Sequence, residues 1–337
     1  MLTLKSKTDI PRLIIFAATL AILLPAAAMS QEFSNWSAAV NVGSTINTSA
    51  NDQHPTLSKD GLTMIFVSTR TPTAGGNDLW VTERDSLEDP WQPAINLAFL
   101  NSAGTDFAPE FSTDGHWLFF HSDRPGGCGS TDIYAAHRKD KRDVFGWDEI
   151  DNLGCTLNTA ASDAGPTVFQ DPVTGVFTMY INRNLLIPPD TEGFDIYMST
   201  CAADLSSCNR DQLWGPAIYV AELSMPGFRD TRTAIRRRDG LEMILTSSRP
   251  GGCGSQDLWV STRATTADLW SIPVNLDPIN PVTGLPICTT NSTAVDGAMA
   301  ISWEGTEMYF FSNRTPGGFG GNDLYRTTRT KLTGQKD

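Results

Sequence analysis

Five aspartates begin similar segments of the chain, and their carboxylates are the first groups in it that could do chemistry. They are Asp52, Asp106, Asp163, Asp230 and Asp296. If the fold gathers them around one opening, they repel each other unless backbone N–H groups or a cation compensate their charge. Two interpretations stay open. Each aspartate ties down the connection before it through an Asx-type turn, or the five form a site for Ca²⁺ or for a cationic or polyhydroxylated ligand.

The positions just after these aspartates differ in charge from one segment to the next. His54 follows the first aspartate, Glu110 the second and Arg232 the fourth. A scaffold needs the same residue in every copy, whereas an asymmetric pocket needs different ones, and His54 and Glu110 can act as acid or base. We therefore predict a ligand-binding mouth that is built from these three residues and the five aspartates.

A second polar set recurs in every segment: an arginine ends one apolar run, and an aspartate begins the next run after a loop. The residues are Arg70 with Asp78, Arg124 with Asp132, Arg183 with Asp195, Arg249 with Asp257, and Arg314 with Asp323. Facing positions on two strands suit a bidentate arginine–carboxylate pair. A catalytic group is needed only once, so we predict that these pairs fasten each hairpin.

These segments are copies of one repeating unit. Each unit holds four short runs rich in Val, Ile, Phe, Tyr and Trp, separated by Asp-Gly or Gly-Gly turns, which predict four antiparallel strands. Such a blade has two faces to bury, so copies must pack around an axis. The fifth unit lacks the tryptophan-bearing last run, and the stretch around Trp36 supplies it. The sequence predicts an all-β fold: a five-bladed β-propeller of four-stranded antiparallel blades, closed by the N-terminal strand.

Six cysteines suggest disulfides, and the alignment of the units selects the pairs. Two cysteines share one loop position in units two and four, and two others follow the last strand of the same units. The remaining two lie close together in unit three. The predicted pairs are Cys128–Cys155, Cys253–Cys288 and Cys201–Cys208. No C-x-x-C occurs, which argues against a metal–thiolate site, so beyond the Ca²⁺ question we predict no metal and no cofactor.

The N-terminal residues have the layout of a secretory signal. Three basic residues precede an apolar run that ends at Leu24, and small residues follow it. The run is too short to cross a bilayer. We expect a cleaved signal peptide over 1–30, a single propeller over 31–331 and a flexible tail over 332–337. Export would place the protein in an oxidising periplasmic or extracellular compartment, as a monomer without a membrane span.

Composition and motifs exclude several function classes. The formal net charge of −13 disfavours a nucleic-acid partner. The chain has no G-x-S-x-G, P-loop, dinucleotide fingerprint or H-E-x-x-H motif. Hydride transfer, nucleotide hydrolysis and zinc proteolysis therefore have no support in the sequence.

The motifs P-x-x-S-x-D-G, S-x-R, G-G-x-G and D-L-[WY] resemble the WD-like propeller repeats of TolB-type periplasmic proteins over essentially all of the chain after residue 30. The six blades and separate N-terminal domain of TolB itself have no counterpart here, so its partners are not carried over. We favour a non-catalytic binding or scaffold module that recognises a protein or a cell-envelope glycan through its loop-rich face and channel mouth.

The alternative is a carbohydrate-active enzyme that resembles the five-bladed glycoside hydrolases. That resemblance implies acid and base carboxylates on inner strands of different blades, and the first candidates are Asp52, Glu110 and Asp163. Their separation would predict whether the reaction retains or inverts the anomeric centre. The hydrolase interpretation requires that two of them face a common cavity.

Overall fold

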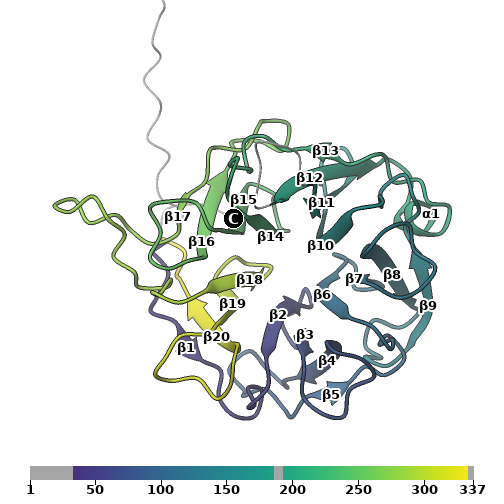
Figure 1. Ribbon diagram of the computed structural model, residues 1–337, viewed down its shortest axis with the longest axis horizontal. Helices are drawn as coiled ribbons and strands as arrows, with labels where there is room; N and C mark the ends of the chain where they lie inside the picture. Colours follow the sequence, from purple (N-terminus) through teal and green to yellow (C-terminus); the bar gives the residue numbers. More distant parts are fainter. Residues whose placement is uncertain (1–32, 186–192, 333–337) are drawn as a thin grey trace, which may run out of the picture.

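The computed structural model describes residues 33–185 and 193–332, and the structural statements that follow concern these residues. Five four-stranded antiparallel sheets stand around a central axis as the blades of a propeller (Figure 1). The fold class is therefore confirmed. The expected signal peptide at 1–30 lies outside the described residues, as does the tail beyond residue 332.

The strands follow the blades in order, from the axis outward. Blade one contains β2 (Asp52–Leu57), β3 (Thr63–Ser68), β4 (Asp78–Glu83) and β5 (Ile95–Asn96). Blade two contains β6 (Asp106–Phe111), β7 (Trp117–Ser122), β8 (Asp132–Arg138) and β9 (Trp147–Asn152). Blade three contains β10 (Ser162–Gln170), β11 (Phe177–Asn184), β12 (Phe194–Cys201) and β13 (Ile218–Tyr219). Blade four contains β14 (Asp230–Ile235), β15 (Glu242–Ser247), β16 (Asp257–Thr262) and β17 (Val274–Asn275). Blade five contains β18 (Asp296–Ile301), β19 (Glu307–Ser312), β20 (Asp323–Thr328) and, as its outer strand, β1 (Val40–Asn41).

Apolar side chains fill the spaces between neighbouring blades. In β3, Ile65 and Val67 pack toward blade two, whereas Met64 and Phe66 pack toward blade five. Successive side chains of a strand point to opposite faces, so a continuous apolar run is what a blade buried on both faces requires. Five such clusters, one between each pair of adjacent blades, form the core.

The N-terminal strand closes the ring. Val40 and Asn41 of β1 pair with Arg326 and Tyr325 of β20. A bridge between Phe33 and Lys331 extends this contact. The first described residues are therefore hydrogen-bonded to the last ones, as the position of the Trp36 stretch predicts.

Arginines stack on tryptophans at the outer turns of four blades. The guanidinium carbons of Arg84, Arg138, Arg263 and Arg329 lie 4.2–4.5 Å from the ring centroids of Trp91, Trp147, Trp270 and Trp36. In blade three, Cys201 occupies the arginine position and forms a disulfide with Cys208 of helix α1 (Leu205–Arg210). A covalent bond thus takes the place of the cation–π contact.

All three predicted disulfides are confirmed: Cys128–Cys155, Cys201–Cys208 and Cys253–Cys288. Two of them join a Gly-rich loop to the connection that leads into the next blade. Disulfides persist in oxidising compartments, which agrees with an extracellular or periplasmic protein. Within the described ranges, no helix is both long and apolar enough to cross a membrane.

Candidate functional site

The five inner-strand aspartates form one structural set, which we call the aspartate ring (Asp52, Asp106, Asp163, Asp230 and Asp296). All five are fully buried. Each accepts a backbone N–H from the connection before its strand, such as Thr48 N to Asp52 Oδ2 at 2.6 Å. Each also pairs with an arginine of its own blade at 2.5–2.6 Å. The geometry therefore agrees with the Asx-type turn, in which each aspartate holds the connection before its strand. These carboxylates have hydrogen-bond partners and do not face the channel, so we propose no Ca²⁺ site among them.

The partner that we predicted for the repeated arginines is wrong. Arg70, Arg124, Arg183, Arg249 and Arg314 pair with the aspartate ring instead of with the aspartates that begin the third strand. Asp78 accepts the loop amides of Ala74 and Gly75, and Asp132, Asp257 and Asp323 accept loop amides in the same way. Because these carboxylates hold the Gly-rich loops, the arginines are left to the inner carboxylates.

A second ring lies two residues after the first, and we call it the bulge ring. Each inner strand has a register shift there, and the residue at the shift has a positive φ. The members are His54 (φ +50°), Ala108 (+52°), Gly165 (+59°), Arg232 (+30°) and Ala298 (+43°). Only glycine adopts this conformation without strain, so the four others are held in it by their surroundings.

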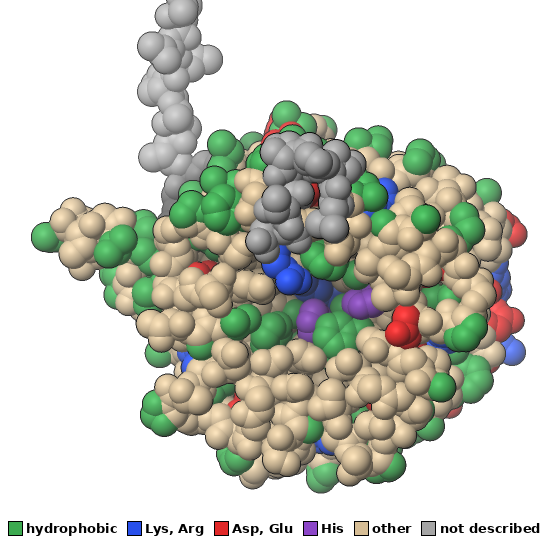
Figure 2. Space-filling view, viewed as in Figure 1, with side chains coloured by type: hydrophobic (Ala, Val, Ile, Leu, Met, Phe, Trp, Pro, Cys, Tyr) green, Lys and Arg blue, Asp and Glu red, His purple; other side chains and the backbone are tan. Residues whose placement is uncertain are grey.

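The bulge ring surrounds a cavity on the axis, the axial pocket, with a volume of about 280 Å³. All five members line it, together with Phe107, His121, Arg229 and Phe311. It opens on the face that carries the Gly-rich loops. Figure 2 shows a central hollow on that face with histidine, basic and hydrophobic side chains around it and an acidic side chain at its rim.

Unsatisfied polar atoms gather around this pocket. His54 Nδ1, Arg229 Nε and Arg232 Nε are buried without a hydrogen-bond partner, and all three residues line the axial pocket. A larger cavity of about 890 Å³ on the opposite face is lined by no residue with such an atom. Buried polar groups are normally hydrogen-bonded, so three unpaired groups around one cavity indicate a place for a ligand.

Arg232 forms the floor of the pocket. Its guanidinium donates to the carbonyl oxygens of Pro109 and Pro166 at 2.7 and 2.6 Å, and it lies 3.4 Å from Glu110 Oε2. Below it, Arg237 donates to the carbonyl oxygens of Phe111 and Leu57, so that side chains of blade four hold blades one, two and three together. Arg236 and Arg237 are both buried.

Two neutral imidazoles face the cavity. Burial, assisted by the charge of Arg232, lowers the pKa of His121 to about 3. Burial likewise lowers the pKa of His54 well below its usual value. His121 Nδ1 accepts the N–H of Gly165 at 3.2 Å, so the proton of the neutral ring is on Nε2. Both rings pack against Phe107, with centroid distances of 4.2 and 5.4 Å.

The structure divides the predicted mouth into two groups. His54 and Arg232 line the axial pocket, and Glu110 contacts it from below through Arg232. Burial raises the pKa of Glu110, although Arg237 and Arg232 oppose this effect. The aspartate ring lies outside the pocket, so Asp52 and Asp163 do not face a common cavity with Glu110. The two-carboxylate assignment to Asp52, Glu110 and Asp163 is therefore wrong.

Sequence reasoning missed His121, Phe107 and Arg229. His121 lies in the second strand of blade two, where its neighbours Phe119 and Phe120 are core residues. Arg229 directly precedes Asp230, at a position where the other blades carry uncharged residues. The departure of Arg229 from the repeat was a signal in the sequence, whereas nothing local distinguished His121.

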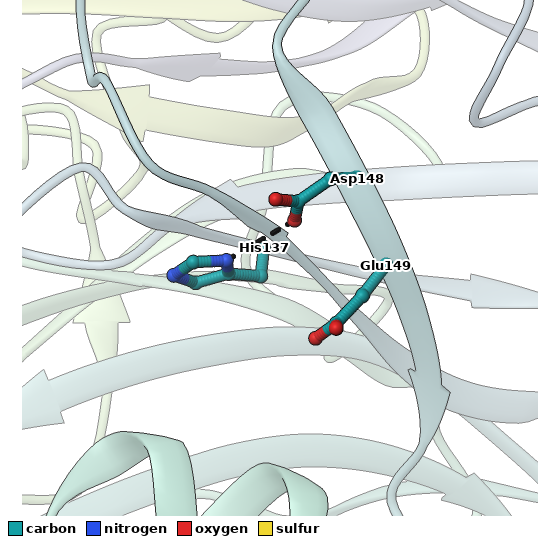
Figure 3. Close-up of side chains that lie close together, drawn as sticks. All are labelled: His137, Asp148 and Glu149. Carbon is teal, nitrogen blue, oxygen red and sulfur yellow. Dashed lines mark hydrogen bonds and ion pairs between the residues drawn. The ribbon is translucent and has the colours of Figure 1, made fainter.

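One group of possible metal ligands lies elsewhere, on the outer strands of blade two (Figure 3). His137 Nδ1 is 3.2 Å from Asp148 Oδ1. Glu149 is exposed and paired with Arg210. These partners account for the group, and we propose no metal site there.

Comparison with known proteins yields structural matches alone: no family model and no curated protein matches the chain. The chain is similar to a thermostable family-43 glycoside hydrolase, with 16% identity, a TM-score of 0.54, and 86% of this chain and 92% of that one covered. It is similar to the alpha-L-arabinofuranosidase of Lactobacillus brevis, at 13% identity, TM-score 0.54, and coverages of 83% and 90%. A third match is the alpha-L-arabinofuranosidase PaAbf62A of Podospora anserina, at 12% identity, TM-score 0.52, and coverages of 89% and 99%.

These matches correct two interpretations of the sequence. The resemblance to TolB-type repeats is wrong, because the similar solved structures are glycoside hydrolases of families 43 and 62. Our preference for a non-catalytic binding or scaffold module, formed beside that resemblance, is wrong as well. At this level of identity the likeness establishes the shared fold, and the chemistry must be argued from the pocket.

Proposed function

We propose that this protein is a carbohydrate-active enzyme that cleaves a glycosidic bond of a glycan held in the axial pocket. The observation that carries the proposal is the set of three unpaired buried polar atoms around that pocket. The fold, which is shared with arabinofuranosidases and other glycoside hydrolases, supports the same class of substrate.

The size and lining of the pocket suit a single sugar residue. Its volume of about 280 Å³ lies at the lower end of ligand pockets, so it would admit the end of a glycan rather than several residues at once. Phe107 and Phe311 offer apolar surfaces to the C–H face of a sugar ring. Hydroxyl groups of the sugar would satisfy His54 and Arg232.

The ionisable residues facing the cavity are arginine cations and neutral histidines. The Nε2–H of neutral His121 and the guanidinium of Arg232 would stabilise negative charge that develops on a substrate oxygen. In hydrolysis the glycosidic C–O bond breaks, the hydroxyl of water joins the anomeric carbon, and the proton of water ends on the leaving oxygen. Glu110 would act as a positioning residue, because it contacts Arg232 and Thr56 rather than the cavity.

The test is release of sugar from a panel of 4-nitrophenyl glycosides and plant and bacterial polysaccharides. We expect activity on at least one member, and a loss of about 100-fold in kcat/KM for His54→Ala and for His121→Ala. The matched control is Glu149→Gln, an exposed residue on the outer edge of blade two, which should retain full activity. Absence of both release and binding across the panel would contradict the proposal, and so would full activity of both histidine variants.

A further inference from the structure

The charge of the axial pocket is opposite to that of the whole protein. The chain carries a net charge of −13. The ionisable side chains lining the pocket are Arg229, Arg232, His54 and His121, and no described lining residue is Asp or Glu. The charged groups that line this cavity are cationic, beside apolar and neutral polar side chains, so the cavity attracts an anion.

Both arginines come from blade four and flank Asp230. The charge of Arg232 is partly balanced by Glu110, at 3.4 Å from its guanidinium. Arg229 has no carboxylate partner among the described residues. Its guanidinium carbon lies 5.0 Å from the ring centroid of Phe194, and its Nε is buried without a partner. The unbalanced positive charge is therefore that of Arg229, whose guanidinium lies beside Phe194 of blade three.

Backbone strain marks Arg232 as a second group that a ligand would contact. Arg232 has φ +30°, in a position where Gly165 of blade three is free of strain. It is 2% exposed, and its Nε has no hydrogen-bond partner. A long cation kept in a strained conformation, desolvated and incompletely bonded, is the arrangement expected where a ligand completes the contacts.

We propose that the sugar bound in the axial pocket carries a carboxylate, as a uronic acid does, and that Arg229 and Arg232 bind that carboxylate. Arg229 can bind a carboxylate through two parallel hydrogen bonds, whereas Arg232 offers its free Nε–H, because its terminal nitrogens already donate to protein carbonyl oxygens. An aromatic wall holds the sugar ring beside them. The inference rests on the proposed function and specifies the substrate class of the same site. The carboxylate lies toward Arg229 and Phe194, and the ring lies toward Phe107 and His54.

The experiment is calorimetric titration of the full chain with glucuronate and galacturonate, against glucose and galactose, which lack the carboxylate. We expect the uronates to bind at least tenfold more tightly than their neutral counterparts. Arg229→Gln should remove most of this difference, because it should weaken uronate binding much more than binding of the neutral sugars. The matched control is Arg142→Gln, an exposed arginine on the opposite face.

The outcomes separate this inference from the proposed function. Equal affinity for charged and neutral sugars, or cleavage of neutral glycosides only, would overturn the inference that the substrate carries a carboxylate. Neither result would contradict the proposed glycosidase activity. Binding of acetate as tight as that of the uronates would show a general anion site and would also overturn it. Uronate binding that depends on Arg229, without any glycoside cleavage, would support recognition of the carboxylate. The same result would contradict the proposed glycosidase activity.

Discussion

The aspartate ring and the bulge ring lie two residues apart on the same five strands, yet they differ in almost every respect. The aspartate ring has one residue type, full burial and a complete set of partners in each blade. The bulge ring has four residue types, strained backbone and unpaired nitrogen atoms. The comparison teaches that the repeat preserves what every blade needs and varies what faces the axis.

The energetic logic of the two rings also differs. A buried carboxylate with a guanidinium and backbone N–H groups is stable only as a complete set, so every blade must carry all of its members. A left-handed residue other than glycine costs about 1 kcal/mol at its site. The bulge ring tolerates that cost at four positions, and at two of them the side chain is large and polar. Those two, His54 and Arg232, are where function is expected.

Breaking the aspartate ring should have the largest effect. In the natural chain a terminal guanidinium nitrogen of Arg249 lies 2.6 Å from Asp230 Oδ1. Arg249→Met removes this guanidinium and leaves the carboxylate of Asp230 buried without its cationic partner. Burial already raises the pKa of Asp230, and Arg249 opposes that shift. We expect the free energy of unfolding to fall by about 3–5 kcal/mol, measured by urea denaturation. Arg142→Met is the exposed control, and a loss no larger than that of the control would refute the scaffold role.

An intermediate effect should appear on acidification and should come from the pocket. The folded pKa of His121 is about 3, below its usual value of 6.5, so the unfolded chain takes up the proton first. Its contribution to stability is complete above pH 6.5 and is lost as the pH falls toward 3. Between pH 7 and pH 5, protonation of His121 in the unfolded chain should lower the free energy of unfolding by about 2 kcal/mol, since one pKa unit is worth about 1.4 kcal/mol.

The control for this prediction is His121→Gln, whose amide oxygen can still accept the N–H of Gly165. We expect the variant to lose less stability than the natural chain when urea denaturation is repeated at pH 7 and pH 5. An identical pH dependence of the two proteins would mean that His121 is not a buried neutral group. His54 remains in both proteins, so its contribution, which has the same direction, cancels in the comparison.

The smallest effect on stability should come from one substitution made at two members of the bulge ring. Ala298→Gly relieves about 1 kcal/mol of strain and removes one buried methyl group worth about 0.8 kcal/mol, so stability should hardly change. Activity and sugar binding should also persist. His54→Gly also places glycine at its position but removes an imidazole from the pocket, so it should lower kcat/KM by about 100-fold, as His54→Ala should. Equal activity of the two variants in the glycoside assay would contradict a functional role for His54 that Ala298 lacks.

Several parts of the site were predictable because they depart from the repeat. His54 and Arg232 stand at equivalent positions with different residues, and the alignment of the units shows it directly. His121 was not predictable, since its strand is otherwise apolar and its place at the cavity depends on how blade two meets blade three. The partner of Arg70 was mispredicted because two carboxylates lie within its reach, and the loop amides that satisfy Asp78 are invisible in a strand pattern.

The sequence by itself determined the number of blades, the closure by the N-terminal strand and the three disulfides, because each follows from periodicity and from the alignment of like positions. Only the tertiary structure decided which carboxylate each arginine binds, that the aspartates are sealed from the channel, and that Arg229, Arg232, His54 and His121 share one cavity. The reason is physical. Local patterns fix which residues form strands, whereas burial, backbone bulges and the meeting of distant blades fix which side chains remain unsatisfied.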